Sequence, residues 1–166
     1  MHPVRLLTLL LLLTGVAAVP ARAVLGETAS ELQKRFGRPD PMLQQGLHRN
    51  VIIWAIETAQ GERLIYTVTF NSKGISIAEG VKPSRRAILA ETLAQNFVDN
   101  QLAVRRDETT THMPKPGEKY KFAGQDFTCA ANESVWVDAA NDFMIVWVKG
   151  KEPLVMAVRA EMLQRK

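Results

Sequence analysis

The chain has 166 residues, of which 46% are hydrophobic and 23% charged, and its formal net charge is only +4. This near balance of charges excludes the strongly basic surface by which nucleic-acid-binding domains neutralise phosphates. The single cysteine, Cys129, excludes an intrachain disulfide.

Residues 1–23 have the pattern of a cleavable signal peptide. A short n-region carries an arginine, an apolar stretch of 16 residues follows over 6–21, and residues 21–23 (Ala-Arg-Ala) have the small-x-small form that signal peptidase requires. The stretch is shorter than the roughly 20 residues that span a bilayer. We therefore expect cleavage between Ala23 and Val24, a periplasmic or secreted protein, and no transmembrane span in the mature chain.

The expected mature chain, residues 24–166, has 143 residues with 19 basic and 17 acidic side chains. This length fits one domain with its own hydrophobic core. No cysteine lies near the cleavage site, so we expect no lipid anchor. Cys129 has apolar neighbours, which favour a small buried side chain over a reactive thiol.

The first predicted element is a short helix over residues 29–36. Thr28 and Glu31 form a capping box, in which each side chain satisfies a backbone N–H at the start of the helix. Gly37 suits the left-handed conformation that ends a helix, and Pro39 prevents its continuation.

Three strand-like runs follow, over residues 51–57, 63–71 and 75–81. The first is almost wholly apolar, whereas the second alternates between apolar and polar residues with a period of two. These runs predict an antiparallel meander with one face toward the core.

A second helix is predicted to begin at Pro83 and Ser84, with Leu89, Leu93 and Phe97 as its apolar stripe. The stretch 98–118 that follows this helix is mostly polar, which predicts an exposed connection.

The polar stretch 98–118 is also a candidate binding loop, because long loops in compact domains are often functional. It carries three of the possible interaction residues, Arg105, Arg106 and His112. The arginine pair is otherwise typical of a solvated surface.

The last part of the chain predicts further strands. They cover residues 119–122, 127–130, 134–137, 143–149 and a final segment, 154–163, that begins as a strand and ends as a helix. The fold class is therefore α+β, an antiparallel sheet with two short helices on one face. The order of elements suggests tandem units of a helix and a meander, 24–82 and 83–166.

The segment from Leu25 to Glu31, continued by Phe36, Gly37 and Pro39, resembles the start of the BamE/SmpA and β-lactamase-inhibitor-like group of small envelope proteins. The resemblance covers about the first third of the mature chain. It implies an α+β module that binds other proteins in the bacterial envelope as an assembly accessory or inhibitor. It assigns no functional residue, and the second half of the chain extends beyond the single unit usual in the group.

Catalytic and metal-binding patterns are absent from the sequence. His48, His112 and Cys129 have no partners at metal-ligand spacing. Asp138 and Asp142 lack the spacing of a calcium loop and are typical of a hairpin turn. We expect no cofactor and no metal.

The three tryptophans lie in strand runs. Trp54 and Trp147 share the parity of apolar neighbours, which predicts burial in the core. Trp136 has the polar Ser134 on its own face, so it is the tryptophan expected to point outward as an interaction platform.

Two functions remain open at this point. The first is an exported, non-catalytic module that binds an envelope protein through a sheet face or residues 98–118. The alternative is a small secreted enzyme, such as a hydrolase, whose site is assembled from His112, Asp126 and Cys129. The enzyme requires that these three side chains converge in a pocket.

Overall fold

A computed structural model describes residues 24–85, 88–103 and 111–164. The predicted signal peptide, its cleavage residue Ala23, Arg105 and Arg106 lie outside these residues. The strands are β1 (Val51–Glu57), β2 (Arg63–Phe70), β3 (Ser76–Pro83), β4 (Lys119–Phe122), β5 (Gln125–Thr128), β6 (Glu133–Asp138), β7 (Phe143–Val148) and β8 (Leu154–Arg159). The helices are α1 (Ala29–Phe36), α2 (Glu91–Ala103) and α3 (Ala160–Leu163), with 3-10 turns η1 (Pro41–Gln44) and η3 (Ala139–Asn141).

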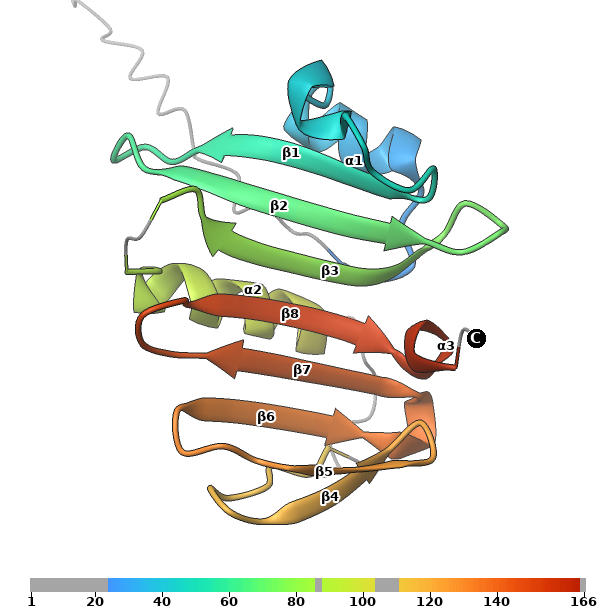
Figure 1. The fold of residues 1–166 in the computed structure, drawn as a ribbon, viewed down its shortest axis with the longest axis vertical. Helices are drawn as coiled ribbons and strands as arrows, with labels where there is room; N and C mark the ends of the chain where they lie inside the picture. Colours follow the sequence, from blue (N-terminus) through green and yellow to red (C-terminus); the bar gives the residue numbers. More distant parts are fainter. Residues whose placement is uncertain (1–23, 86–87, 104–110, 165–166) are drawn as a thin grey trace, which may run out of the picture.

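Six of the described strands form one antiparallel sheet in the order β1-β2-β3-β8-β7-β6, and β4 pairs with β5 in a separate hairpin (Figure 1). The α+β class predicted from the sequence is confirmed. Two meanders, β1–β3 and β6–β8, meet where β3 pairs with β8, with Ala78 opposite Val158 and Val81 opposite Val155. The two halves of the chain therefore share one continuous sheet.

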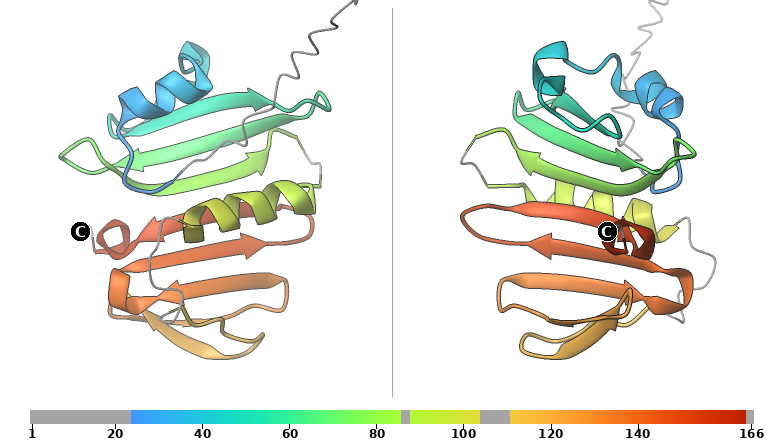
Figure 2. Two further views of the ribbon diagram at one scale, coloured as in Figure 1. Left: turned by 180° about the vertical axis from the view of Figure 1, so that it is seen from behind. Right: turned by 45° about the vertical axis from the view of Figure 1, so that its right-hand side comes forward.

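Helices α1 and α2 lie on the same face of this sheet, as predicted (Figure 2). Leu32 of α1 and Phe97 of α2 belong to the same core as Trp54 and Trp147, whose predicted burial is confirmed. This helix-side core runs across both halves of the molecule.

Helix α1 is held by the capping box that the sequence predicts. The backbone N–H of Glu31 donates to Thr28 Oγ1 at 3.3 Å, and the backbone N–H of Thr28 donates to Glu31 Oε2 at 2.8 Å. Gly37 follows the helix with φ of 77°, a conformation that favours glycine. Helix α1 has the predicted bounds, 29–36.

Helix α2 begins at Glu91, so the predicted start at Pro83 and Ser84 is wrong. Pro83 still lies opposite Leu64 in the sheet, and the Ser84 N–H donates to the Arg63 carbonyl at 2.9 Å. Because these two residues continue the β-ladder, a helix cannot begin there. The helix also continues to Ala103, so the first residues of the predicted connection 98–118 are helical.

Strand β5 lies two residues earlier than predicted. Ala123 and Gly124 both have positive φ, 53° and 77°, and form a two-residue turn that puts Gln125 opposite Phe122. The following Cys129 lies beyond the strand and is buried. The tight turn thus sets the register of the hairpin.

The two halves differ on the face of the sheet opposite α1 and α2, the hairpin face, toward which Figure 1 looks. In the C-terminal half, the β4–β5 hairpin and α3 cover this face and bury a second core. That core contains Tyr120, Phe122, Cys129, Val135, Val137, Met144 and Val158. In the N-terminal half this second core reaches β3 at Ala78, whereas residues 53, 55, 65 and 67 of β1 and β2 stay half-buried on the same face.

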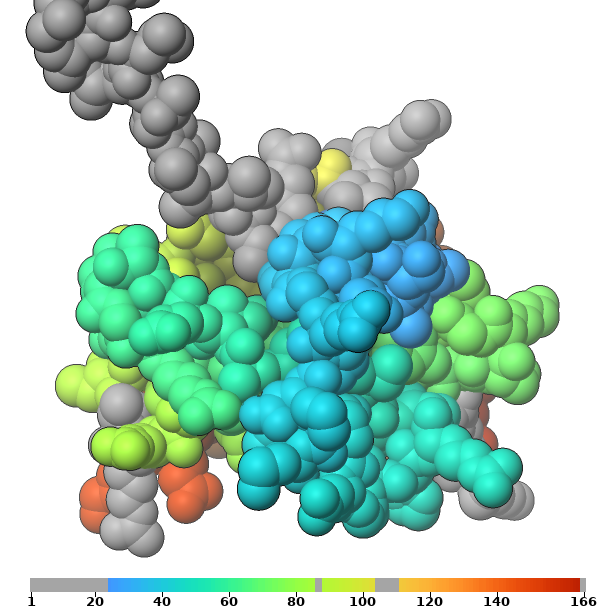
Figure 3. All heavy atoms as spheres, turned by 90° about the horizontal axis from the view of Figure 1, so that it is seen from above, coloured from blue at the N-terminus to red at the C-terminus, as the bar shows by residue number. Residues whose placement is uncertain are grey.

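Both outer edges of the sheet are partly occupied by side chains or backbone of the same chain. Gln44 of η1 donates from Nε2 to the Ile53 carbonyl at 2.7 Å and accepts from the Ile53 N–H at 3.3 Å, which blocks part of the β1 edge. Figure 3 shows residues 24–50, in blue to cyan, gathered on this side. At the other edge, His112 and Val137 of β6 form an antiparallel bridge with N···O distances of 2.7 and 2.8 Å.

Candidate functional site

On the hairpin face, β1, β2 and the adjoining strand β8 carry a continuous group of mostly apolar, half-buried side chains. In β2, residues 64, 66, 68 and 70 are buried on the helix side, so residues 65 and 67 point the other way. Register then places their partners from β1 on the same face. We call this group the open patch; it consists of the half-buried side chains Ile53, Ala55, Ile65, Thr67, Leu154 and Met156.

A glycine at the centre of the sheet leaves a shallow depression in the open patch. Gly80 lies between Thr67 of β2 and Met156 of β8. A Cβ atom at Gly80 would lie 3.5 Å from Leu154 Cδ1 and 3.5 Å from Met156 Cβ, which is ordinary contact. The sheet therefore has room for a side chain at this point, and the chain leaves it empty.

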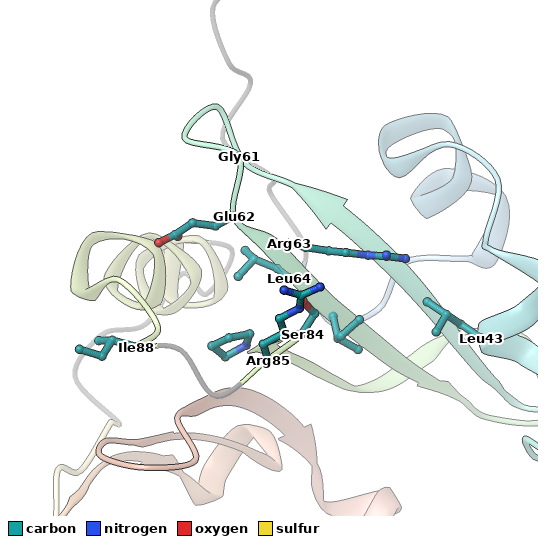
Figure 4. A pocket seen from close by; sticks show the side chains of 10 residues that line it. Leu43, Gly61, Glu62, Arg63, Leu64, Ser84, Arg85 and Ile88 are labelled. Carbon is teal, nitrogen blue, oxygen red and sulfur yellow. The ribbon is translucent and has the colours of Figure 1, made fainter.

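One end of the open patch deepens into a hollow of about 590 Å³ (Figure 4). Its apolar lining includes Leu43, Ile65 and Pro83, and its charged lining includes Arg63, Arg85 and Glu62. The hollow thus joins the apolar patch to basic side chains.

The charges near this hollow are mainly positive. Lys82 is exposed and lies opposite Ile65 in the sheet, and Arg85 is also exposed. The Arg63 guanidinium lies 3.7 Å from the Asp40 carboxylate, and 56% of its side chain remains exposed. In Figure 4 the Glu62 side chain points toward α2, away from Arg63. The open patch is therefore apolar in its middle and basic at one end.

A buried carboxylate, Glu79 of β3, lies on the other side of the sheet and is 1% exposed. The Tyr66 hydroxyl donates to Glu79 Oε2 at 2.7 Å, Ser76 Oγ donates to Oε1 at 2.8 Å, and Gln101 Nε2 donates to Oε2 at 3.2 Å. Burial raises the pKa of the Glu79 carboxyl, whereas the three hydrogen bonds lower it. The effect of burial is the larger, so the pKa is raised overall.

The same cluster anchors the start of the described chain. Ser76 Oγ accepts from the N–H groups of Gly26 and Glu27 at 2.9 and 3.1 Å, and Gln101 Oε1 accepts from the Leu25 N–H at 3.1 Å. Glu79 therefore connects strands β2 and β3 with α2 and, through Ser76 and Gln101, with residues 25–27. With its carboxylate enclosed, this cluster is a structural connection between the halves and not a site open to substrate.

Trp136 does not point outward, so its prediction as an exposed platform is wrong. It is 8% exposed and lies opposite Ile145 in the helix-side core. That prediction relied on Ser134, a polar residue on the same side of the strand as Trp136. Ser134 lies near the start of β6, where its side chain is half-buried. Register with β7 places Trp136 inside the core.

His112 is exposed, and its ring nitrogen Nε2 lies 3.1 Å from Glu118 Oε1. Glu118 Oε2 also accepts from the Lys115 N–H at 2.9 Å. The Lys115 amide is the main cause of the lowered pKa of the Glu118 carboxyl, and His112 adds to it. These contacts hold the loop before β4 together, and the backbone bridge of His112 with Val137 attaches the loop to β6. The His112 side chain therefore has a structural role.

The three residues of the enzyme alternative have separate partners. His112 pairs with Glu118, while the Asp126 carboxylate lies 3.9 Å from Lys121 Nζ. Cys129 is buried, and burial raises the pKa of its thiol, which disfavours the nucleophilic thiolate. None of the three lines the hollow next to the open patch. Among the described residues, no group of three or more His, Cys, Asp or Glu side chains could hold a metal ion.

Sequence reasoning missed the open patch and the Glu79 cluster. A signal for the first was the apolar character of Ile53, Ala55 and Ile65, which have the parity opposite to the core residues. A signal for the second was the carboxylate Glu79 between Ile77 and Val81, on the apolar side of strand β3.

Comparisons with known proteins return no match for this chain, either to a family model, to a curated protein or to a solved structure. The resemblance of its first segment to the BamE/SmpA group stays a prediction. Within the described residues, none of the helices has the length and apolar character needed to cross a membrane.

Proposed function

We propose that this chain is an exported, non-catalytic module of the bacterial envelope that binds a protein partner through the open patch. The observation that carries the proposal is the difference between the two halves of one sheet face. The chain covers the C-terminal half with its own hairpin and α3, and it leaves half-buried apolar side chains on the N-terminal half. A contiguous apolar surface rimmed by polar residues is typical of a protein interaction site.

We expect the partner to pack against this face of the sheet and not to add a strand at its edge. Gln44 occupies part of the β1 edge and His112 part of the β6 edge, which limits the pairing of an added strand. Arg63, Lys82 and Arg85 at one end favour acidic side chains opposite them. The partner that fits is a protein surface with apolar side chains next to Asp or Glu.

Export is part of the same proposal. It is supported by the signal-peptide pattern of residues 1–23. Cleavage after Ala23 would remove none of the described hydrogen bonds, which begin at Val24 and anchor Leu25 to Gln101. The resemblance of residues 25–39 to small envelope proteins points to the same compartment.

The experiment that tests the proposal is quantitative co-purification from cells that make the tagged mature chain. The wild type is compared with Lys82→Glu, a charge reversal beside the open patch, and with Gln95→Glu, an exposed change on α2. We expect Lys82→Glu to reduce recovery of one reproducible partner about tenfold, because it repels acidic side chains. Gln95→Glu should leave the recovery unchanged.

Equal recovery with the two variants would contradict the proposal. Ile65→Asp provides a second test, since it puts a charge in the middle of the open patch, and its folding is checked by circular dichroism. A folded Ile65→Asp protein that keeps the partner would also contradict binding through this face.

A further inference from the structure

A second hollow, of about 610 Å³, lies on the helix side of the sheet, opposite the open patch. Its floor includes Leu64, Tyr66 and Val81 from β2 and β3, and its walls include Phe36 of α1 and Leu93 of α2. Figure 2 shows α1 and α2 apart from each other on this face. We call this hollow the helix groove. Its volume is in the range of sites that bind small molecules or short peptide segments.

The apolar floor of the helix groove is partly accessible. Phe36, Val81 and Leu93 are half-buried, and the Phe36 ring lies 4.8 Å from the Tyr66 ring and 6.2 Å from the Trp54 ring, between ring centroids. Trp54 is itself fixed, because its Nε1 donates to the Gly37 carbonyl at 3.0 Å. The floor is therefore a preformed aromatic and aliphatic surface.

The polar lining of the groove includes three carboxamide side chains. Asn96 and Asn100 lie on α2, and Gln60 lies in the turn between β1 and β2. A carboxamide both donates and accepts hydrogen bonds, so it matches the N–H and C=O groups of a peptide backbone. Amides on two sides of an apolar floor therefore suit an extended peptide.

Glu57 and Glu62 are the charged side chains among the described residues that line the groove. Both are exposed, and Figure 4 shows Glu62 pointing toward α2. The nearby Arg35 is paired with Glu27, to which its Nη1 donates at 2.8 Å. The mouth of the groove therefore favours a cation, in contrast to the basic end of the open patch.

We propose that the helix groove binds a short peptide segment that carries apolar side chains together with Lys or Arg. The apolar side chains lie on the floor formed by Leu64, Val81 and Leu93, and the cation lies at Glu57 and Glu62. This site goes beyond the function proposed above, because its floor is on the other face of the sheet and it selects the opposite charge; Leu64 and Glu62 also line the hollow beside the open patch.

Calorimetric titration of the mature protein with two synthetic peptides tests this inference. One is acetyl-Leu-Lys-Leu-Lys-amide and the other is acetyl-Leu-Glu-Leu-Glu-amide, and the non-peptide cation decyltrimethylammonium is a third probe. We expect the basic peptide to bind about tenfold more tightly than either other probe at low ionic strength. The double variant Glu57→Gln with Glu62→Gln should lose most of the preference between the two peptides.

A matched pair of tryptophan variants locates the binding. Asn96→Trp places a large side chain in the groove and should weaken the basic peptide at least about tenfold. The control is Gln95→Trp, at the preceding position of α2, which does not line the groove. This variant should bind the peptide like the wild type. Lys82→Glu at the open patch should also leave peptide binding unchanged, which separates this site from the proposed partner surface.

Three results would overturn the inference. They are equal binding of the acidic and basic peptides, unchanged affinity in Asn96→Trp, and tighter binding of decyltrimethylammonium than of the basic peptide. These results are independent of the test of the proposed function, because each can be observed whether or not the Lys82→Glu variant loses the protein partner.

Discussion

The N-terminal and C-terminal halves of this sheet have the same order of a helix and three antiparallel strands, but only one of them is covered on both faces. In the C-terminal half, Phe122 of the hairpin is 2% exposed and packs in the core with Val135 and Met144. In the N-terminal half, Ile65 on the same face of the sheet is half-exposed. The comparison teaches that burying the second face stabilises one half, whereas the other half keeps a partly exposed apolar surface, through which we propose that a partner binds.

Phe122→Ala tests the covered half and should have the largest effect. Removing a buried aromatic ring lowers the free energy of unfolding by about 3–5 kcal/mol, because apolar contacts are lost and a cavity is left. Urea unfolding followed by tryptophan fluorescence measures the change. A loss below about 1 kcal/mol would mean that the hairpin adds little to the C-terminal half.

Tyr66→Phe tests the connection between the halves. The variant keeps the ring contacts with Phe36 and Trp54 but removes the hydroxyl that donates to Glu79 at 2.7 Å. We expect a loss of about 1–3 kcal/mol in the free energy of unfolding, because the buried carboxylate loses a donor. Equal stability of the two proteins above pH 7 would contradict a structural role for this hydrogen bond.

The pH dependence of stability tests the same buried group. Burial raises the pKa of Glu79 in the folded protein above its unfolded value. The folded state therefore holds this proton more tightly, and the contribution is complete below the unfolded pKa and is lost as the pH rises through the folded pKa. Glu79→Gln does not titrate at this position.

We therefore expect the wild type to lose stability relative to Glu79→Gln as the pH rises through this window. The comparison is made by urea unfolding at a series of pH values from about 4 to 8, a range that begins near the unfolded pKa of a glutamate. A difference between the two proteins that does not change with pH would contradict the raised pKa.

Ile65→Ala should have the smallest effect on stability. Its half-exposed side chain loses few buried contacts, so the free energy of unfolding should fall by about 1 kcal/mol or less. The same urea assay measures it beside Phe122→Ala. A loss as large as that of Phe122→Ala would mean that the face of the N-terminal half is a core and not an open surface.

Local signals in the sequence predicted much of the fold. The capping box of Thr28 and Glu31 and the glycine after it depend on neighbours in the chain, and they place α1 correctly. The alternation in β2 likewise follows from the geometry of a single strand with one buried face.

The features that the sequence did not predict depend on partners far apart in the chain. Pro83 stays extended because Leu64 pairs with it, and Trp136 is buried because Ile145 lies opposite it in the helix-side core. The open patch is defined by the place where the β4–β5 hairpin ends its coverage, which no local pattern specifies. Glu79 is satisfied by donors from β2, β3 and α2, so its role was visible only in the folded chain.

The most direct test of the account is photo-crosslinking in intact cells with p-benzoylphenylalanine at position 65, in the open patch, and at position 95, on the outer side of α2. The account predicts a crosslink from position 65 to one defined protein with an acidic and apolar surface, and none from position 95. Position 65 giving no crosslink, or the same products as position 95, would contradict the claim that the uncovered half of the sheet is the binding surface.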